Sequence, residues 1–346
     1  MVGTLAGHLD RTGARVLELL ELDDNDLVQA VAGRRTGGLT RRLAEFDAAS
    51  AVAGAKAASL QLICRCDPSY PGRLLELPSP PAVLHVAGDL DRLLGLVGEE
   101  PVAIVGTRRP TSYGVEVARS LGGALAAAGL TVVSGMAHGI DSAAHAGAVG
   151  VGGATVAVLA AGADRPYPPS RRELHRRITS TGAVISELPP GSELRRWMFP
   201  ARNRLIAALS AITVVVEAGT RSGALLTASW ARSLGRVVCA VPGRITTPQS
   251  SGPNVLLQQG AHLVTGAQDV LDALYGAGSR TLIGQGRPEP DPELRPWLDA
   301  VAAGHDTAEA LARAGLAPER TLEVLSELEL SGHIRRKAGG RFAVVP

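Results

Sequence analysis

The sequence predicts an α/β protein built on an extended Rossmann-like, doubly wound sheet, with a helical domain before it and a winged helix after it. The main observation is that short apolar runs alternate with helical stretches between residues 101 and 265. The runs are continuously apolar, as expected for parallel strands that are buried on both faces. We expect strands at 102–105, 131–134, 155–159, 183–186, 213–216 and 237–241.

The composition agrees with an α/β protein that packs small side chains. Hydrophobic residues make up 45% of the 346 residues, aromatic residues only 3%, and 41 positions are glycine. A chain of this length is expected to hold two or three domains. Its net charge of +2 excludes little, but Lys56 and Lys337 are the only lysines. Nearly all positive charge is therefore arginine, which suits bidentate phosphate contacts, although a GC-rich codon bias explains the same skew.

The three cysteines are Cys64, Cys66 and Cys239, too few for a disulfide framework and without C-x-x-C spacing. This usage fits a reducing cytoplasm and predicts no metal site, and we expect no cofactor. The N-terminus lacks a signal-like apolar run, and no stretch of about 20 residues is apolar enough to span a membrane. We therefore expect a cytoplasmic protein with no membrane segment.

Residues 1–66 predict a small helical domain of the SAM or helix-hairpin-helix kind. Apolar residues recur there at helical spacing, at Val16, Leu17, Leu19, Leu20, Leu39, Leu43 and Phe46. Residues 67–87 contain five prolines and are expected to be extended. They open the Rossmann-like domain, which we place at 67–275.

Residues 276–291 are rich in Gly, Pro and Arg and predict a linker. Residues 292–346 predict a winged helix, with helices at 294–303, 307–314 and 318–330 and a hairpin around Gly339 and Gly340. The expected recognition helix carries mostly acidic charge, from Glu319, Glu323, Glu327 and Glu329 against Arg320. Because DNA phosphates repel an acidic helix, we favour protein contact for this domain over duplex DNA binding.

Two of the predicted strands run directly into Gly/Ser loops that open helices. Backbone N–H groups in such loops, and the helix N-terminus after them, attract anions. Adjacent parallel strands place both loops at one edge of the sheet, where ligands usually bind. We therefore predict a phosphate site from the two loops, formed by Gly106, Thr107, Arg108, Arg109, Ser134, Gly135, Gly139 and Ile140. Plain βα turns are the alternative. The first loop is not G-x-G-x-x-G, and the chain has no Gly-Lys pair, which excludes a Walker A loop.

Residues 164–204 hold nine arginines with interleaved aromatic side chains, Tyr167, Trp197 and Phe199. Proteins that bind single-stranded nucleic acid place cations along its phosphate backbone and aromatic rings against its bases. The segment therefore predicts a groove for single-stranded nucleic acid. From this segment we take as candidate contacts Arg171, Arg172, Arg202 and Arg204. Some of the arginines must instead lie on solvated helix faces. Trp197 and Phe199 could equally belong to the hydrophobic core.

The remaining ionisable residues favour structural roles. Glu217 follows a strand and could be a catalytic base, but we prefer a buried anchor for Arg202 or Arg204. Asp141 is expected to cap the helix that follows it. His138 and His145 have no carboxylate or cysteine at ligand spacing and are interpreted as structural. We therefore predict no catalytic residue and no enzyme activity.

In combination, the motifs resemble those of the DprA/Smf family of DNA-processing proteins, in one order over about residues 100–265. They are residues 104–108, 134–141, 157–159, Tyr167-Pro168, Ser186-Glu187, 199–204, 216–218, Ser222-Gly223, Thr227-Ala228, 240–243 and 252–254. The resemblance implies that Arg108 is the family's phosphate-loop arginine. Three departures are Thr107 in place of the usual Ser, Ser170 in place of Asn, and Ala160-Ala161-Gly162 in place of a more Gly-rich turn. Arg171 and Arg172 are therefore weaker assignments.

The resemblance also implies a function. The family is expected to bind single-stranded DNA as a recombination mediator, to protect incoming DNA and to help load RecA during natural transformation. Expected partners are single-stranded DNA, RecA, a second copy in a homodimer and a single-strand-binding protein. Two alternatives are a nucleotide N-glycosidase of the related lysine-decarboxylase-like group, using Glu217, and a nucleotide sensor.

Overall fold

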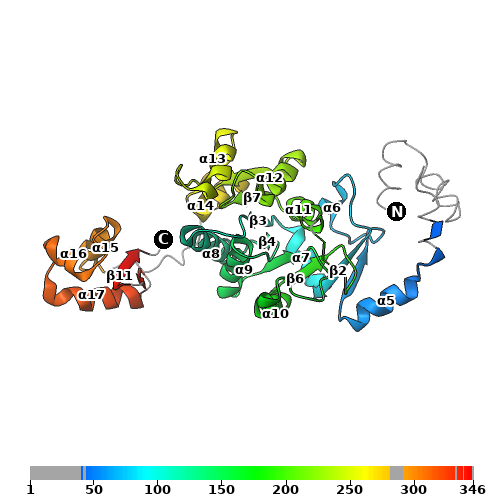
Figure 1. Cartoon of the computed structure of the whole chain (residues 1–346), viewed down its shortest axis with the longest axis horizontal. Coiled ribbons are helices and arrows are strands. Elements are labelled where there is room, and N and C mark those ends of the chain that lie inside the picture. The colour runs from blue at the N-terminus through cyan, green and yellow to red at the C-terminus, as the bar shows by residue number, and fades with distance from the viewer. Residues whose placement is uncertain are drawn as a thin grey trace. The chain divides into compact units, whose positions relative to one another are not determined.

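The structure is a computed structural model that describes residues 40–280 and 291–344, except 42, 43, 193, 196, 332 and 338. It divides into two compact units, one up to residue 281 and one from residue 282 (Figure 1). Most of the helical domain predicted at 1–66, including its apolar positions up to Leu43, lies outside the described residues. Phe46 is described and is exposed.

The first unit is built on one sheet of nine strands, in the order β1-β2-β6-β5-β4-β3-β7-β8-β9. Its centre consists of parallel strands, which confirms the predicted mostly parallel α/β sheet. These are β3 (Val102–Val105), β4 (Val132–Ser134), β5 (Thr155–Val158), β6 (Ala183–Ser186), β7 (Ile212–Val215) and β8 (Val237–Ala240). Nearly every residue in them is buried, because helices cover both faces.

The edges of the sheet were not foreseen. β1 (Gln61–Cys64) and β2 (Val83–Gly88) form an antiparallel pair at one edge, and β9 (His262–Leu263) lies at the other. The boundary predicted at residue 66 falls between these two paired strands, so residues 61–64 belong with the sheet. Four residues with half-exposed ends give little strand signal in a sequence. The cysteine at the end of β1 is in a disulfide with Cys66.

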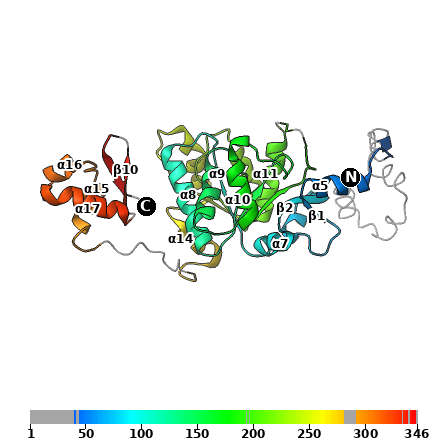
Figure 2. The same cartoon turned by 90° about the horizontal axis from the view of Figure 1, so that it is seen from below.

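Helices pack on both faces of the sheet, as a doubly wound fold requires (Figure 2). One face carries α5 (Ala48–Ala57), α8 (Ser112–Ala127), α9 (Ile140–Gly150), α10 (Arg172–Thr181) and α14 (Ala267–Tyr275). The other carries α6 (Gly72–Leu75), α7 (Leu90–Gly98), α11 (Met198–Leu209), α12 (Gly223–Ser233) and α13 (Ser251–Gln258). Two short 3-10 turns, η2 (Pro169–Arg171) and η3 (Pro248–Ser250), complete the unit. No described helix is long and apolar enough to cross a membrane.

The helices α8 and α9 approach each other closely because glycines line their contact. A Cβ atom on Gly147 would lie 2.0 Å from the carbonyl oxygen of Arg119, and one on Gly122 would lie 2.3 Å from that of Ala144. Both distances are shorter than van der Waals contact, so neither position admits a side chain while the helices hold this spacing. α9 is thereby held tightly over β3 and β4, whose ends carry the predicted loops.

The second unit contains α15 (Arg295–Ala302), α16 (Ala308–Arg313), α17 (Pro318–Leu330) and an antiparallel hairpin of β10 (Ile334–Lys337) and β11 (Arg341–Val344). Its own core includes Trp297, Leu311, Leu325 and Phe342. The helices and hairpin lie within a few residues of where the sequence predicts them. The winged-helix assignment itself stays a prediction.

We expect Gly147→Ala to lower the free energy of unfolding by about 1–3 kcal/mol, the usual cost of forcing an atom into a packed contact. Gly150→Ala, at the end of the same helix, is the matched control, because its added Cβ meets nothing within 4 Å. It should be neutral or stabilise by up to about 1 kcal/mol through the lower entropy of the unfolded chain. Urea unfolding followed by circular dichroism measures both. Equal effects of the two variants would contradict the packing argument.

Candidate nucleic-acid interface

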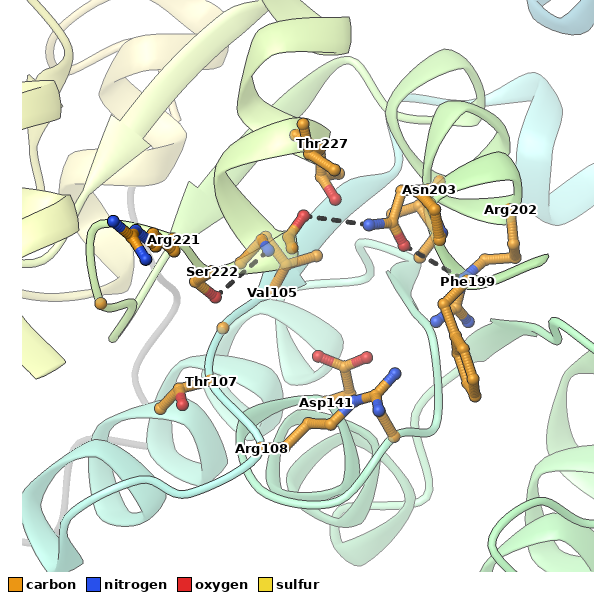
Figure 3. Close-up of a pocket in the computed structure, with 18 of the residues that line it drawn as sticks. Val105, Thr107, Arg108, Asp141, Phe199, Arg202, Asn203, Arg221, Ser222 and Thr227 are labelled. Atoms are coloured by element: carbon orange, nitrogen blue, oxygen red, sulfur yellow. Dashed lines mark hydrogen bonds between the residues drawn. The ribbon is translucent and has the colours of Figure 1, made fainter. Parts of the chain in front are cut away.

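A cavity of about 610 Å³ opens at the carboxyl ends of β3 and β7. The chain runs from β3 toward one edge of the sheet and then from β7 toward the other, so these neighbours mark the point where the strand order reverses. Open α/β sheets bind ligands at such points. The cavity is lined by the loops at 105–109 and 219–222 and by the first turns of α11 and α12 (Figure 3).

The structure brings only some of the predicted site residues together. Gly106, Thr107, Arg108, Arg109 and Arg202 line this cavity. The others lie elsewhere. Gly139 and Arg171 line a hollow of about 280 Å³ beside α8 and α10, and Arg172 and Arg204 line two further hollows. Ser134, Gly135 and Ile140 are buried.

A buried carboxylate lies close to the loops after β3 and β4. Asp141 is buried in the first turn of α9, and the backbone of Ala137, Gly106 and Gly135 opposes the rise of its pKa that burial causes. Further N–H groups are also used within the fold, since Thr107 donates to the Glu217 carbonyl at 2.6 Å and Ile140 to the Thr107 carbonyl at 3.3 Å. The N–H groups of Thr107 and Ile140 are therefore engaged within the fold, and phosphate binding by these loops stays a prediction. Asp141 is not the helix cap, which is Gly139.

The glycines of the two loops allow close packing within the protein. A Cβ on Gly135 would lie 2.2 Å from the Arg202 guanidinium, and one on Gly106 would lie 2.5 Å from the Ile140 side chain. Gly139 has φ +82°, and its Cβ would lie 2.4 Å from the Thr107 carbonyl oxygen. Protein atoms therefore fill the space that a side chain at these three positions would need. The Ser134 hydroxyl is likewise engaged, donating to the Ile104 carbonyl at 2.6 Å.

Arg202 lines the cavity but is almost fully buried in its floor. Its guanidinium donates to the carbonyl of Gly135 at 2.8 Å and to that of Val158. Burial lowers the pKa of Arg202 to about 10, an effect that the charge of Asp141 opposes and that of Arg108 reinforces. Burial also raises the pKa of Asp141, against the opposing influence of Arg202. The two buried charges support each other and join β4, β5 and α11.

Arg204 is also engaged within the protein, because it forms an ion pair with Glu187 and donates to the Ser79 carbonyl at 2.8 Å. Burial raises the pKa of Glu187, while Arg204 opposes the rise. Of the predicted arginines that line the main cavity, Arg108 and Arg109 are the exposed ones. Arg196, another arginine of the segment, lies outside the described residues.

An exposed cation and an aromatic ring lie together in the lining of the cavity, and a second ring packs against the first. The Arg108 guanidinium carbon is 4.2 Å from the centre of the Phe199 ring. The Phe199 and Tyr167 rings are 5.7 Å apart and inclined by 50°. Trp197 is 58% exposed, so neither it nor half-buried Phe199 belongs to the core. This arrangement supplies a charge for phosphate and apolar faces for bases.

The sequence reasoning missed the other wall of the cavity, formed by residues 219–224, Leu226, Thr227 and Asn203. Ser222 is the N-cap of α12 and accepts a hydrogen bond from the Ala224 N–H at 3.3 Å. Asn203 Nδ2 donates to the Gly223 carbonyl at 3.0 Å. The sequence does contain a signal for this wall. A third Gly/Ser turn, at 219–223, follows a strand in the same way as the two turns from which the site was predicted.

Glu217 is a buried anchor, but for a different partner than expected. Its carboxylate accepts hydrogen bonds from the Thr111 N–H at 2.8 Å and the Thr111 hydroxyl at 2.6 Å, at the start of α8. A Cβ on Gly114 would lie 2.3 Å from this carboxylate, which explains the glycine there. Glu217 does not line the cavity, so its position does not favour a catalytic base.

A cavity with arginines on its surface, at the reversal point of a doubly wound sheet, defines an α/β protein suited to an anionic ligand. The family model of DNA recombination-mediator protein A matches residues 61–275, more than half of the chain, and the chain belongs to this family. The match spans the sheet from its first strand, β1, to the end of α14.

Two relatives and two solved structures show the extent of the similarity. A DprA relative from Mycobacterium tuberculosis is 44% identical over 245 residues, 68% of this chain and 62% of the relative. Protein Smf from Synechocystis is 41% identical over 227 residues, 66% of this chain and 56% of the relative. The chain therefore spans less than two thirds of the length of either.

DNA processing protein A from Streptococcus pneumoniae superimposes with a TM-score of 0.69 at 33% identity, covering 79% of this chain and 92% of that one. The protein from Helicobacter pylori, whose structure concerns its single-stranded DNA binding mode, gives a TM-score of 0.56 at 29% identity, covering 63% and 97%.

We expect Arg202→Met to lower the free energy of unfolding by about 3 kcal/mol, because it removes the positive charge that favours ionised Asp141 and leaves two buried carbonyls without donors. Arg108→Met removes an arginine from the surface instead, and it should change the free energy of unfolding by less than about 0.5 kcal/mol. Chemical denaturation at neutral pH compares the two. A small effect of Arg202→Met would mean that its interactions with the floor of the cavity stabilise little.

His145 makes the stability depend on pH. It is fully buried, its Nδ1 lies 2.7 Å from the Thr155 hydroxyl, and burial lowers its pKa to about 3 from the ordinary 6.5. The unfolded chain binds a proton at this residue below pH 6.5 and the folded protein does not. Stability should therefore fall by up to about 1.4 kcal/mol per pH unit from pH 6.5 down to 3.

His145→Gln should reduce that slope over the same range, whereas His138→Gln, at an exposed position, should leave it unchanged. Denaturation curves at a series of pH values give the slopes. An unchanged slope in His145→Gln would assign the acid sensitivity to other groups.

Proposed function

We propose that this chain binds single-stranded DNA as a recombination mediator, and that the strand lies across the cavity mouth. The observation that carries the proposal is Arg108, exposed and 4.2 Å above the Phe199 ring at the reversal point of the sheet. A guanidinium and a ring on one surface can meet a phosphate and the base beside it. Family membership supports the same reading, as does the described DNA binding of the Helicobacter pylori protein.

The chemistry favours single strands over duplex. Bases must be unpaired to stack on Phe199 and Tyr167, and stacking on aromatic rings is tolerant of sequence. In the second unit, the outward residues of α17 include Glu319, Glu323 and Glu327, which are unsuited to a phosphate-lined groove. We also infer that Arg109 meets the strand backbone and that Arg171 and Arg172, on the α10 side, extend its path.

The wider role is part of the same proposal. We place the protein in the cytoplasm as a non-catalytic homodimer that protects incoming DNA, loads RecA onto it and meets a single-strand-binding protein. RecA and single-strand-binding protein rest on the family alone. The exposed edge strand β9 offers a surface for a second copy, since both of its residues are exposed. We further infer that the second unit is a winged helix that contacts protein.

We expect a labelled oligo-dT strand to bind more tightly than a duplex of equal length at the same salt concentration. Arg108→Ala should weaken strand binding by about 1.5–3 kcal/mol, the value of a hydrogen bond to a charged group. The slope of log affinity against log salt should become shallower by about 0.7, because one phosphate is no longer neutralised. Fluorescence anisotropy measures the affinity, and circular dichroism checks that the variant is folded.

Arg109→Ala is the matched comparison, since it removes the neighbouring exposed arginine. If only Arg109→Ala weakens binding, Arg109 and not Arg108 makes the main contact. If both folded variants bind as tightly as the wild type, or if duplex binds as tightly as single strand, the proposed site is wrong.

A further inference from the structure

We propose that the opposite wall of the same cavity is a second phosphate subsite, formed by the N-terminus of α12 with Arg221, Ser222 and Thr227. Its ligand is the phosphate group of a nucleotide, and the strand proposed above is the expected source. The inference rests on the proposed function and adds a contact that lies across the cavity from Arg108. Figure 3 shows Ser222, Thr227 and Asn203 along one side of the cavity, with Thr107 and Arg108 along the other.

The α12 helix presents a well-formed N-terminus to the cavity. It is 11 residues long and begins at Gly223, and residues 219–224 line the cavity. The N-terminal N–H groups of a helix carry partial positive charge and attract phosphate. The one carboxylate among the residues that line the cavity is Asp141, which lies on the β3 side. The lining at the α12 end therefore contains no carboxylate that would repel a phosphate.

The side chain of Thr227 gives a second indication of a ligand, independent of the helix N-terminus. Only 1% of its surface is exposed, yet it lines the cavity. Among the described residues its hydroxyl has no hydrogen-bond partner, although a helical Thr often bonds back to the carbonyl four residues earlier. That carbonyl belongs to Gly223 and accepts instead from Asn203 Nδ2. The Thr227 hydroxyl is therefore free to hydrogen-bond an acceptor that enters the cavity.

Arg221 supplies the charge. It is exposed, lines the cavity and has no ion pair or hydrogen bond from its side chain within the described part of the chain. Its guanidinium is therefore available for a phosphate at the helix end. Asn203 acts as a positioning residue, because its Oδ1 accepts from Arg202 Nε at 3.3 Å while its amide holds Gly223. The buried arginine thus helps to fix the N-terminus of α12.

The test uses the full chain and measures oligo-dT affinity over several salt concentrations. Arg221→Ala should weaken binding about tenfold, with a salt slope shallower by about 0.7. Thr227→Val, which keeps the shape and removes a neutral donor, should weaken binding about fivefold with an unchanged salt slope. Thr227→Ser should restore most of the lost affinity. Arg232→Ala is the control, since it removes an arginine that bonds Gln259 at the far end of the same helix.

A parallel titration with dTMP, followed by thermal denaturation, distinguishes the source of the phosphate. Loss of oligo-dT affinity in both variants supports a strand phosphate, and loss of dTMP stabilisation alone supports a free nucleotide; either result supports the subsite. If the wild type binds oligo-dT but Arg221→Ala and Thr227→Val bind both probes as Arg232→Ala does, the subsite is refuted and the proposed function stands. If the wild type binds neither probe, both proposals fail.

Discussion

The site depends on one buried charged group, the Asp141 carboxylate, whose charged form is favoured by Arg202 and by the backbone of the loops after β3 and β4. The carboxylate lies buried in the first turn of α9, directly after the loop that follows β4. With Arg202 close enough to counter its charge, it ties together β3, β4, β5 and α11. The close approach of α8 and α9, made possible by Gly122 and Gly147, keeps α9 and its carboxylate in position.

Much of the fold was predictable because parallel strands buried on both faces are continuously apolar. All six central strands lie within a residue or so of the expected positions, and α17 has the expected bounds. The edge strands β1 and β9 were not predictable in the same way. They are four and two residues long with exposed positions, so they carry almost no periodic signal. β1 belongs to the sheet because it pairs with β2, and residues 61–64 alone do not reveal this partner.

The candidate site was predictable at its location but not in its details. The Gly/Ser loop after β3 lines the cavity, but the second wall comes from the loop after β7 and not from the one after β4. A glycine required for packing has the same appearance in a sequence as one that approaches a phosphate. Only the structure shows that Arg202 fills the space at Gly135. Similarly, the sequence favours a surface position for Arg202 and Arg204, because arginine is usually exposed. Their internal partners Val158 and Glu187 lie far from them in sequence.

The stacking of Arg108 on Phe199 has a consequence for any aromatic ligand. The ring face that a base would cover is already covered by a guanidinium in the free protein. Association is therefore an exchange reaction, in which one favourable contact with the ring is given up as another forms. The net gain from stacking is the difference between them, whereas the released guanidinium becomes free to pair with phosphate. Shape and charge recognition are thereby coupled in a single side chain, because a molecule that offers a flat ring without an anion would displace Arg108 without compensating it.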